Sequence, residues 1–232
     1  MRHICVIGGN RYFGRRLIRL LLAGGDRVTV VNRGSAASPP GAEHVVADRA
    51  DAAALARALG GRTFDAVVDQ VCYTPSHADA ARRVFAGALS RLLGEAAAYA
   101  EGKRQAEAVF ARDPAFPFLA VRSAHVLGGG DADFTGRLRH YVDRVRAGLP
   151  VAVHRDPAPT SFVHHAEIAA FLHWTATGTD VTGALNAASR DTLTVTGLCA
   201  PIAAATGSPA PVHRVVTGGE PSPTSSRKAD RP

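Results

Sequence analysis

The sequence predicts an α/β fold built on a doubly wound parallel sheet, and three observations support this prediction. In the first half of the chain, short apolar strands alternate with helical stretches, the pattern of a parallel sheet covered by helices. A glycine-rich turn lies between the first strand and the first helix. A second strand follows within about thirty residues, a spacing typical of a nucleotide-binding βαβ unit.

The predicted elements of this first half are short and end near turn residues. The strands are apolar runs, expected at residues 3–7, 27–31, 44–47 and 66–71. The helices have apolar residues three and four positions apart, and we expect them at residues 13–22, 51–59 and 76–89. In the first helix, Phe13, Leu17 and Leu21 share one side, and Gly24-Gly25 ends it.

The alternation breaks after residue 89. Another helical stretch, about Ala96 to Ala111, follows after only Ser90 to Gly94, and we predict no strand between the two helices. The later elements are mixed: strands at 118–121, 151–153, 161–163 and 212–215, helices at 136–147, 166–175 and 194–205, and a short segment at 184–186.

These elements predict two domains and a tail. Residues 1–130 form a dinucleotide-binding domain, and residues 131–216 form a small C-terminal α/β substrate lobe interleaved with the sheet. Residues 217–232, rich in Pro, Ser and charge, are expected to be disordered.

Composition excludes several classes of protein. No apolar run among the 232 residues reaches the ~18 needed to span a membrane, and the first apolar stretch is too short for a signal peptide. The three cysteines are far apart, which argues against a disulfide framework or a metal site and fits a cytoplasmic protein.

The net charge of +7 raises nucleic acid as a partner. However, all but two of the 27 basic residues are arginines, they are scattered, and aromatic residues make up only 6% of the chain. A basic stripe interleaved with stacking rings is absent from the sequence, so we favour a small-molecule substrate over nucleic acid.

The glycine-rich turn predicts a dinucleotide site. Glycines are needed where the chain turns tightly and where the helix packs on the sheet, and a pyrophosphate then rests on free N–H groups at the helix start. The residues expected to form this cradle are Gly8, Gly9, Asn10, Arg11, Tyr12, Phe13 and Gly14.

The end of the second strand indicates which dinucleotide binds. An acidic residue there would hold the ribose hydroxyls of NAD, whereas Asn32-Arg33 suits the 2′-phosphate of NADP, and Arg11 could clamp the same phosphate. We therefore expect NADP, with NAD as the alternative. Asp48, followed by Arg49, could accept a hydrogen bond from the adenine amino group or could cap the helix near Asp51.

Together these motifs resemble the extended or atypical short-chain dehydrogenases/reductases, in particular the NAD-dependent epimerase/dehydratase-like proteins. The resemblance runs through Gly8 to Gly14, Val30 to Gly34 and Ala47 to Arg49, and continues through Tyr99-Ala100-Glu101-Gly102-Lys103. It covers nearly the whole chain to about residue 215 and implies a Rossmann-type fold.

The resemblance also implies a catalytic pair, Tyr99 and Lys103. In this family the tyrosine is the acid/base at the carbonyl or alcohol oxygen, while the lysine lowers the tyrosine pKa and binds the nicotinamide ribose. The two residues are four apart in the predicted helix and therefore share a face. An ordinary amphipathic helix could carry the same pair.

One departure from the family is serious. The family has a strand before this helix, ending in a Ser or Thr, and neither is predicted before Tyr99. Without that strand, Tyr99 would be displaced by about one strand length, ~17 Å. Either a segment is missing from this sequence, or the protein lacks it and has a remodelled or inactive site.

Other candidate residues have structural explanations. Cys72 is expected to be a small core residue, and His164-His165 a polar pair at a helix start. Gly128 to Asp131 would begin the substrate lobe, and no metal site is predicted.

The prediction is therefore a ketoreductase-type oxidoreductase that moves hydride between NADP(H) and a small-molecule carbonyl, and analogy suggests a secondary metabolite as substrate. Within that class, an atypical enzyme could leave the proton transfer to substrate or solvent instead of Tyr99. One alternative is a nucleotide-sugar epimerase or dehydratase. The other is a non-catalytic nucleotide-binding protein with a degenerate dehydrogenase fold.

Overall fold

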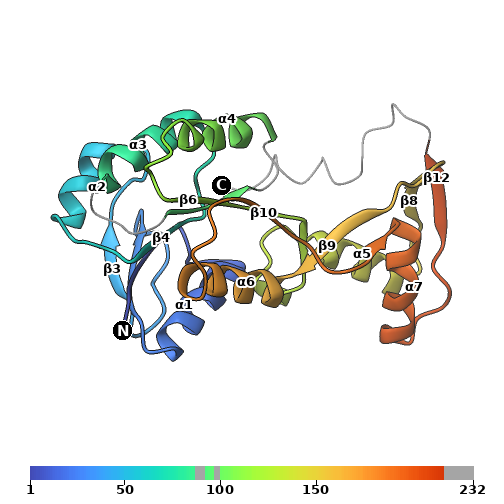
Figure 1. Ribbon diagram of the computed structural model, residues 1–232. Helices are drawn as coiled ribbons and strands as arrows, with labels where there is room; N and C mark the ends of the chain where they lie inside the picture. The colour runs from blue at the N-terminus through green and yellow to red at the C-terminus, as the bar shows by residue number, and fades with distance from the viewer. Residues whose placement is uncertain (87–91, 97–99, 217–232) are drawn as a thin grey trace. The chain divides into compact units, whose positions relative to one another are not determined.

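The computed structural model describes residues 1–86, 92–96 and 100–216. Its main sheet has seven strands in these ranges, in the order β10-β6-β5-β4-β1-β2-β3, and all neighbours are parallel (Figure 1). The strands are β1 (His3–Ile7), β2 (Arg27–Asn32), β3 (Glu43–Val46), β4 (Ala66–Asp69), β5 (Leu92–Ala96), β6 (Phe118–Ser123) and β10 (Gly183–Ala187). The predicted doubly wound Rossmann-type sheet is thus confirmed. The strand order reverses between β1 and β4, where such folds bind ligands at the carboxyl edge.

Helices cover both faces of this sheet because its strands are apolar on both sides. On one face lie α1 (Tyr12–Ala23) and α6 (His165–Thr177), and on the other lie α2 (Ala52–Leu59), α3 (Pro75–Phe85) and α4 (Ala100–Ala111) (Figure 1). Successive residues of β1 point to opposite faces, so Ile4 and Val6 pack toward α1 whereas Cys5 and Ile7 pack toward α2 and α3. No helix in the described part of the chain is long and apolar enough to cross a membrane.

The prediction that no strand lies between the helices expected at residues 76–89 and 96–111 is wrong. Helix α3 ends at Phe85, β5 spans Leu92–Ala96, and α4 begins at Ala100. Strand β5 lies between β4 and β6, with Leu92 opposite Val67 and Phe118. Its Leu-Leu-Gly-Glu-Ala sequence has low intrinsic strand propensity, but pairing on both sides outweighs propensity in a central strand.

Strand β5 removes the topological objection to the site. A parallel strand followed by a helix returns the chain to the carboxyl edge of the sheet, which is where α4 begins. The expected displacement of the following helix by a strand length therefore does not occur for the described residues of α4. Tyr99 lies outside the described residues.

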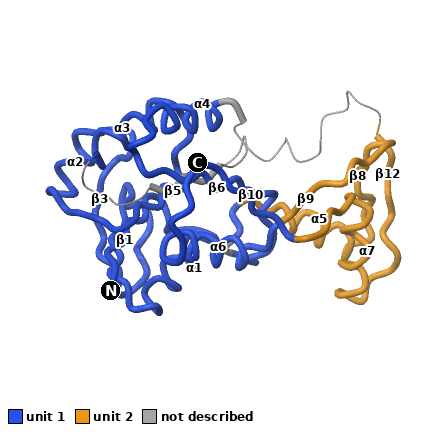
Figure 2. Tube along the Cα trace, viewed as in Figure 1, with its two compact units in different colours: residues 1–134, 163–189 blue, residues 135–162, 190–232 orange. Residues whose placement is uncertain are grey.

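The chain forms two compact units (Figure 2). Unit 1 comprises residues 1–134 and 163–189 and contains the main sheet. It also holds β7 (His125–Leu127) and a 3₁₀ helix (Gly130–Ala132). The predicted substrate role of residues 131–216 stays a prediction, and the predicted tail, 217–232, lies outside the described residues.

Unit 2 comprises residues 135–162 and the chain from Arg190 onward. It pairs β8 (Val151–His154) in parallel with β12 (His213–Val216), and β11 (Thr192–Leu193) antiparallel with the first residues of β9 (Thr160–His164). Its helices are α5 (Arg137–Arg146) and α7 (Val195–Thr206).

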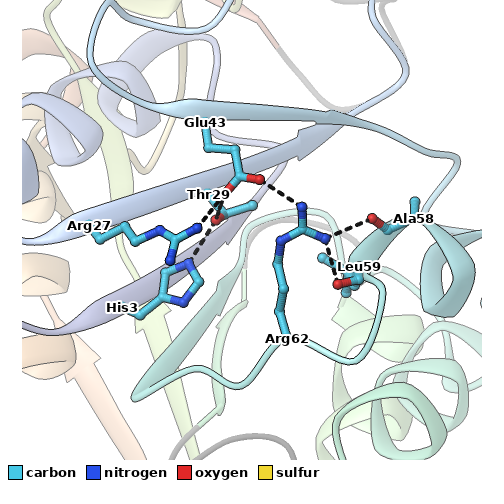
Figure 3. Close-up of polar contacts among 7 residues, drawn as sticks. All are labelled: His3, Arg27, Thr29, Glu43, Ala58, Leu59 and Arg62. Carbon is cyan, nitrogen blue, oxygen red and sulfur yellow. Dashed lines mark hydrogen bonds and ion pairs between the residues drawn. The ribbon is translucent and has the colours of Figure 1, made fainter.

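A polar network connects the amino-terminal halves of β1, β2 and β3, on the face of the sheet that α2 covers (Figure 3). The hydroxyl of Thr29, fully buried on β2, donates to Glu43 Oε2 at 3.0 Å and lies 2.8 Å from His3 Nε2. Glu43 also receives hydrogen bonds from Arg62 at 2.7 Å and Arg27 at 3.3 Å. The network links β1, β2 and β3 to the chain that follows α2, and it lies away from the ligand edge.

Candidate functional site: a dinucleotide cradle at the switch point

The glycine-rich turn connects β1 to α1 at the point where the strand order reverses. Its glycines are tightly packed: a Cβ at Gly9 would lie 2.6 Å from Val6 Cγ1, and one at Gly8 would lie 2.9 Å from Val71 Cγ1. A Cβ at Gly14 would lie 2.8 Å from the Cα and carbonyl oxygen of Gly9 and would clash with the Gln70 side chain. Only glycine lets α1 approach the turn this closely.

The amino end of α1 is available to a ligand. The N-cap residue, Arg11, makes no side-chain capping bond, and the first turn carries no acidic residue. By contrast, Asp51 caps α2 and Thr74 caps α3 through their side-chain oxygens. The uncapped N–H groups and the positive end of the helix dipole together favour an anion at this position.

Other residues of the turn give it a fixed shape. Asn10 is buried, and its Nδ2 donates to the Ala36 carbonyl at 2.7 Å, which ties the turn to the loop after β2. Tyr12 is buried and has φ 52°, a left-handed conformation rare for a non-glycine residue. Its ring stacks on His165 at 6.0 Å and meets Phe13 at 5.2 Å, so both turn aromatics contribute to packing.

The end of β2 carries the residues expected at the adenosine ribose. Asn32 Oδ1 accepts hydrogen bonds from Gly34 N at 2.7 Å and from His44 Nε2 at 3.1 Å, so the amide group is oriented. Arg33 and Arg11 are both exposed, and neither forms an ion pair with another described residue. Both guanidinium groups are therefore available to an anionic ligand.

Asp48 and Arg49 differ from each other in environment. Asp48 is exposed and accepts from Ala50 N at 2.9 Å, while Asp51 caps α2, so the alternative that Asp48 caps this helix is wrong. Arg49 is buried, and its Nη2 lies 2.5 Å from Asp69 Oδ2 in an ion pair whose side chains are 8% and 1% exposed. The carboxylate compensates the buried guanidinium charge, which burial alone would make costly.

Lys103 is buried one turn into α4. Its Nζ lies 4.6 Å from the centroid of the Tyr73 ring, which comes from the loop after β4. The structure thus brings Lys103 to the same end of the sheet as Asp69 and the glycine turn, as the fold requires for a cofactor contact. The arrangement of its predicted partner, Tyr99, lies outside the described residues.

Unsatisfied polar atoms collect at this carboxyl edge. Four residues at or just beyond strand ends have buried nitrogen or oxygen atoms with no hydrogen-bond partner among the described residues: Asn32 (Nδ2), Arg49 (Nε and Nη1), Gln70 (Nε2) and Ser123 (Oγ). Buried polar groups in folded proteins are nearly always satisfied, so these atoms point to a polar ligand. Together with the glycine cradle and the uncapped helix, they fit a dinucleotide.

Gln70 and Ser123 were not among the site residues predicted from the sequence. Gln70 is the first residue after β4, Ser123 is the last residue of β6, and polar residues at the carboxyl ends of parallel strands face the ligand edge. A polar residue after an apolar strand was therefore the available signal.

Other candidate residues have structural roles. Burial and the Asp69 charge raise the pKa of the Cys72 thiol to about 12, so this cysteine stays protonated and is a core residue. His164 caps α6 by accepting from the Ala166 N–H, and Glu167 accepts a hydrogen bond from the His164 N–H, as expected for a polar helix start. A Cβ at Gly129 would lie 2.7 Å from the Tyr12 ring, so this glycine serves close packing.

A glycine turn, an uncapped helix and a polar strand edge at the switch point of a doubly wound sheet are typical of Rossmann-type α/β proteins, and they form a candidate dinucleotide site. Residues 4–87 match the sequence model of the NAD dependent epimerase/dehydratase family, so the resemblance inferred from the motifs is confirmed over this segment. A comparison with curated protein sequences found no match.

Solved structures with a similar fold include epimerases and a dehydratase. The enzyme WbmH from Bordetella bronchiseptica, in complex with NAD+, is 19% identical, with 93% of this chain and 86% of that chain covered and a TM-score of 0.75. UDP-glucose 4-epimerase from Thermotoga maritima, with UDP-glucose, is 16% identical, with 94% and 87% covered and a TM-score of 0.75. The dTDP-glucose 4,6-dehydratase from Bacillus anthracis, in complex with NAD, is 12% identical, with 94% and 85% covered and a TM-score of 0.77. At these identities the likeness concerns the fold.

Proposed function

We propose that this chain is an NAD(P)-dependent enzyme of the epimerase/dehydratase type that acts on a nucleotide sugar. The observation that carries the proposal is the uncapped start of α1 behind a glycine turn that no larger residue could form. The family match over residues 4–87 supports the same class. The solved structures with a similar fold include a UDP-glucose 4-epimerase and a dTDP-glucose 4,6-dehydratase, which favours this function over the ketoreductase predicted first.

The proposed cofactor contacts follow from the geometry. N–H groups at the start of α1 would bind the pyrophosphate, and Asn32 with Gln70 would supply amide groups to the adenosine side. Asp48 remains the proposed partner of the adenine amino group. Arg49 is not proposed as a direct contact through Nη2, because Asp69 occupies that nitrogen.

The proposed chemistry uses one proton-transferring pair. A bound nicotinamide supplies reversible hydride acceptance at the reacting carbon. Tyr99 would remove or return the hydroxyl proton, and Lys103 would stabilise the tyrosinate by its positive charge and hold the nicotinamide ribose. Residues 131–216 are proposed as the substrate-binding region.

A second candidate is the NADP(H)-dependent ketoreductase. The exposed guanidinium of Arg33 at the end of β2 favours it, because an arginine there can bind a 2′-phosphate. The two candidates differ in stoichiometry, since a reductase consumes one NADPH per product whereas an epimerase consumes none.

The test uses the full chain and defined probes. Binding of NADH and NADPH is measured by the fluorescence of the reduced nicotinamide. The protein is then incubated with NAD+ and UDP-glucose or dTDP-glucose, and the sugar products are followed by NMR, with Tyr99→Phe as the variant. A C4 epimer or a 4-keto product that disappears in Tyr99→Phe supports the proposal.

Other outcomes separate the alternatives. Net consumption of NADPH with a ketone substrate would establish the ketoreductase instead. Product formation that survives Tyr99→Phe would exclude this tyrosine as the acid/base. Dinucleotide binding without turnover on any probe would favour the non-catalytic alternative, and absence of binding by either dinucleotide would refute the class.

A further inference from the structure

Lys103 has an aromatic partner that the catalytic scheme does not include. The lysine is only 6% exposed, and charged side chains are rarely buried this deeply without compensation. Its Nζ lies 4.6 Å from the centroid of the Tyr73 ring, within the ~6 Å over which a cation is attracted to a ring face. The ring therefore stabilises the ammonium at this position.

The backbone fixes the ring relative to the lysine. A Cβ at Gly102 would lie 2.5 Å from the carbonyl oxygen of Tyr73. The backbone of α4 therefore packs directly against Tyr73 at the position before Lys103. On its other side, the Tyr73 N–H donates to Nδ1 of His77 at 3.2 Å, in the first turn of α3. Tyr73 is thus held between α3 and α4, and the close approach to α4 depends on glycine at position 102.

The contact between Lys103 and Tyr73 is separate from the buried ion pair of Arg49 and Asp69. Asp69, at the end of β4, binds the Arg49 guanidinium through one oxygen and the Val71 N–H through the other. Its carboxylate is therefore engaged by Arg49 and the backbone, and the face of the Tyr73 ring supplies a stabilising contact for the Lys103 ammonium.

We propose that Tyr73 is a positioning residue that holds the Lys103 ammonium where it meets the nicotinamide ribose. This inference rests on the proposed function, because that function gives Lys103 its cofactor contact. A lysine side chain is long and flexible, and fixing it before the cofactor arrives removes an entropic cost from binding.

The contact itself can be tested without any ligand. The chain has only two lysines, Lys103 and Lys228, so the full protein with ¹³C-labelled lysine gives two sets of ε-CH₂ signals. Lys103→Met assigns the set that disappears. Ring current from Tyr73 shifts the Lys103 signals upfield, and we expect this shift to persist in Tyr73→Phe and to vanish in Tyr73→Leu. An unshifted Lys103 signal in the wild type overturns the proposal.

A double-mutant cycle on NADH binding tests the positioning role. We expect Tyr73→Leu to weaken NADH binding about 5- to 30-fold, Tyr73→Phe to restore most of it, and Lys103→Met to weaken it at least as much as Tyr73→Leu. In Lys103→Met, the further change Tyr73→Leu should have almost no effect. Trp174→Leu, at a similarly exposed aromatic on α6, is the control for loss of an exposed ring.

The outcomes separate a failure of the positioning role from a failure of the proposed function. If Lys103→Met weakens binding but Tyr73→Leu does not, the positioning role is wrong and the proposed function stands. Additive effects of the two substitutions would mean that Tyr73 acts independently of the lysine, which also overturns the role. If the wild type binds neither NADH nor NADPH, the proposed function fails and the positioning role fails with it, whatever the NMR shift shows.

Discussion

Gly14→Ala gives the most direct test of the cradle. The new methyl group would lie 2.8 Å from both Gly9 Cα and the Gly9 carbonyl oxygen, whereas carbon atoms pack at about 3.5 Å or more. The Gln70 side chain can rotate away, but the backbone of the turn must move by about 0.7 Å. Alanine improves helix propensity by about 1 kcal/mol at this position, which offsets part of the strain in the free protein.

The same displacement has a larger effect on the ligand. A backbone N–H···O bond of about 2.9 Å lengthened by about 0.7 Å is no longer a hydrogen bond. Each bond to a charged group contributes about 1.5–3 kcal/mol, so losing one weakens NADH binding about 10- to 100-fold. We therefore expect a severe binding defect with a modest change in the free energy of unfolding.

The assay is NADH fluorescence titration, with urea unfolding in parallel. Gly24→Ala is the matched control, because Gly24 ends the same helix at φ −76° and a Cβ there meets nothing closer than 3.4 Å. If Gly14→Ala binds NADH as tightly as the wild type, the pyrophosphate does not lie at this turn.

Three further predictions concern charges and hydrogen bonds. Asp69→Asn leaves the Arg49 charge buried and should destabilise the protein by about 3–5 kcal/mol in urea unfolding. Asp113→Asn, at the solvent-accessible pair with Arg82, should have a much smaller effect, and equal effects would contradict the role of burial. Arg33→Ser should weaken NADPH binding about tenfold or more with little change for NADH, and an equal loss for both would exclude a 2′-phosphate contact. Thr29→Val removes the bridge between His3 and Glu43 and should lower the free energy of unfolding by about 1 kcal/mol at pH 7. Burial would raise the pKa of Glu43, but hydrogen bonds from Thr29, Arg62 and Arg27 lower this pKa below its usual value. The ionised carboxylate therefore stabilises the fold above about pH 4.5, and this contribution is lost as the pH falls further. Urea unfolding at pH 7 and pH 3.5 should therefore show a smaller acid-induced loss in Thr29→Val than in the wild type, and parallel curves would argue against this network.

Local sequence signals predicted the first four strands of the main sheet because these strands are strongly apolar and the glycine turn is distinctive. Strand β5 was missed for the opposite reason: Gly94, Glu95 and Ala96 do not favour a strand, and only pairing with β4 and β6 makes one. Such long-range pairing cannot be recognised within a short window of sequence.

The candidate site was predictable where residue type alone decides the chemistry, as at Gly9 and Gly14. The role of Arg49 was not, since a guanidinium after a strand can face a ligand or an internal carboxylate, and only the fold places Asp69 beside it. The contact of Tyr73 with Lys103 joins residues thirty positions apart, and no spacing rule anticipates it.

The two ends of the same strands serve different purposes. On β2, Thr29 in the amino half is bonded to both neighbours, whereas Asn32 at the carboxyl end keeps a buried Nδ2 without a partner among the described residues. Around β4 the contrast repeats: Asp65, just before the strand, accepts from His3 N at 2.7 Å, and Gln70, just after it, has an unsatisfied Nε2. Satisfied polar groups contribute to folding, and unsatisfied ones are stabilised only when a ligand arrives. Changes at the satisfied groups Thr29 and Asp65 should therefore alter unfolding more than NADH binding, and changes at the unsatisfied amides of Asn32 and Gln70 should do the reverse.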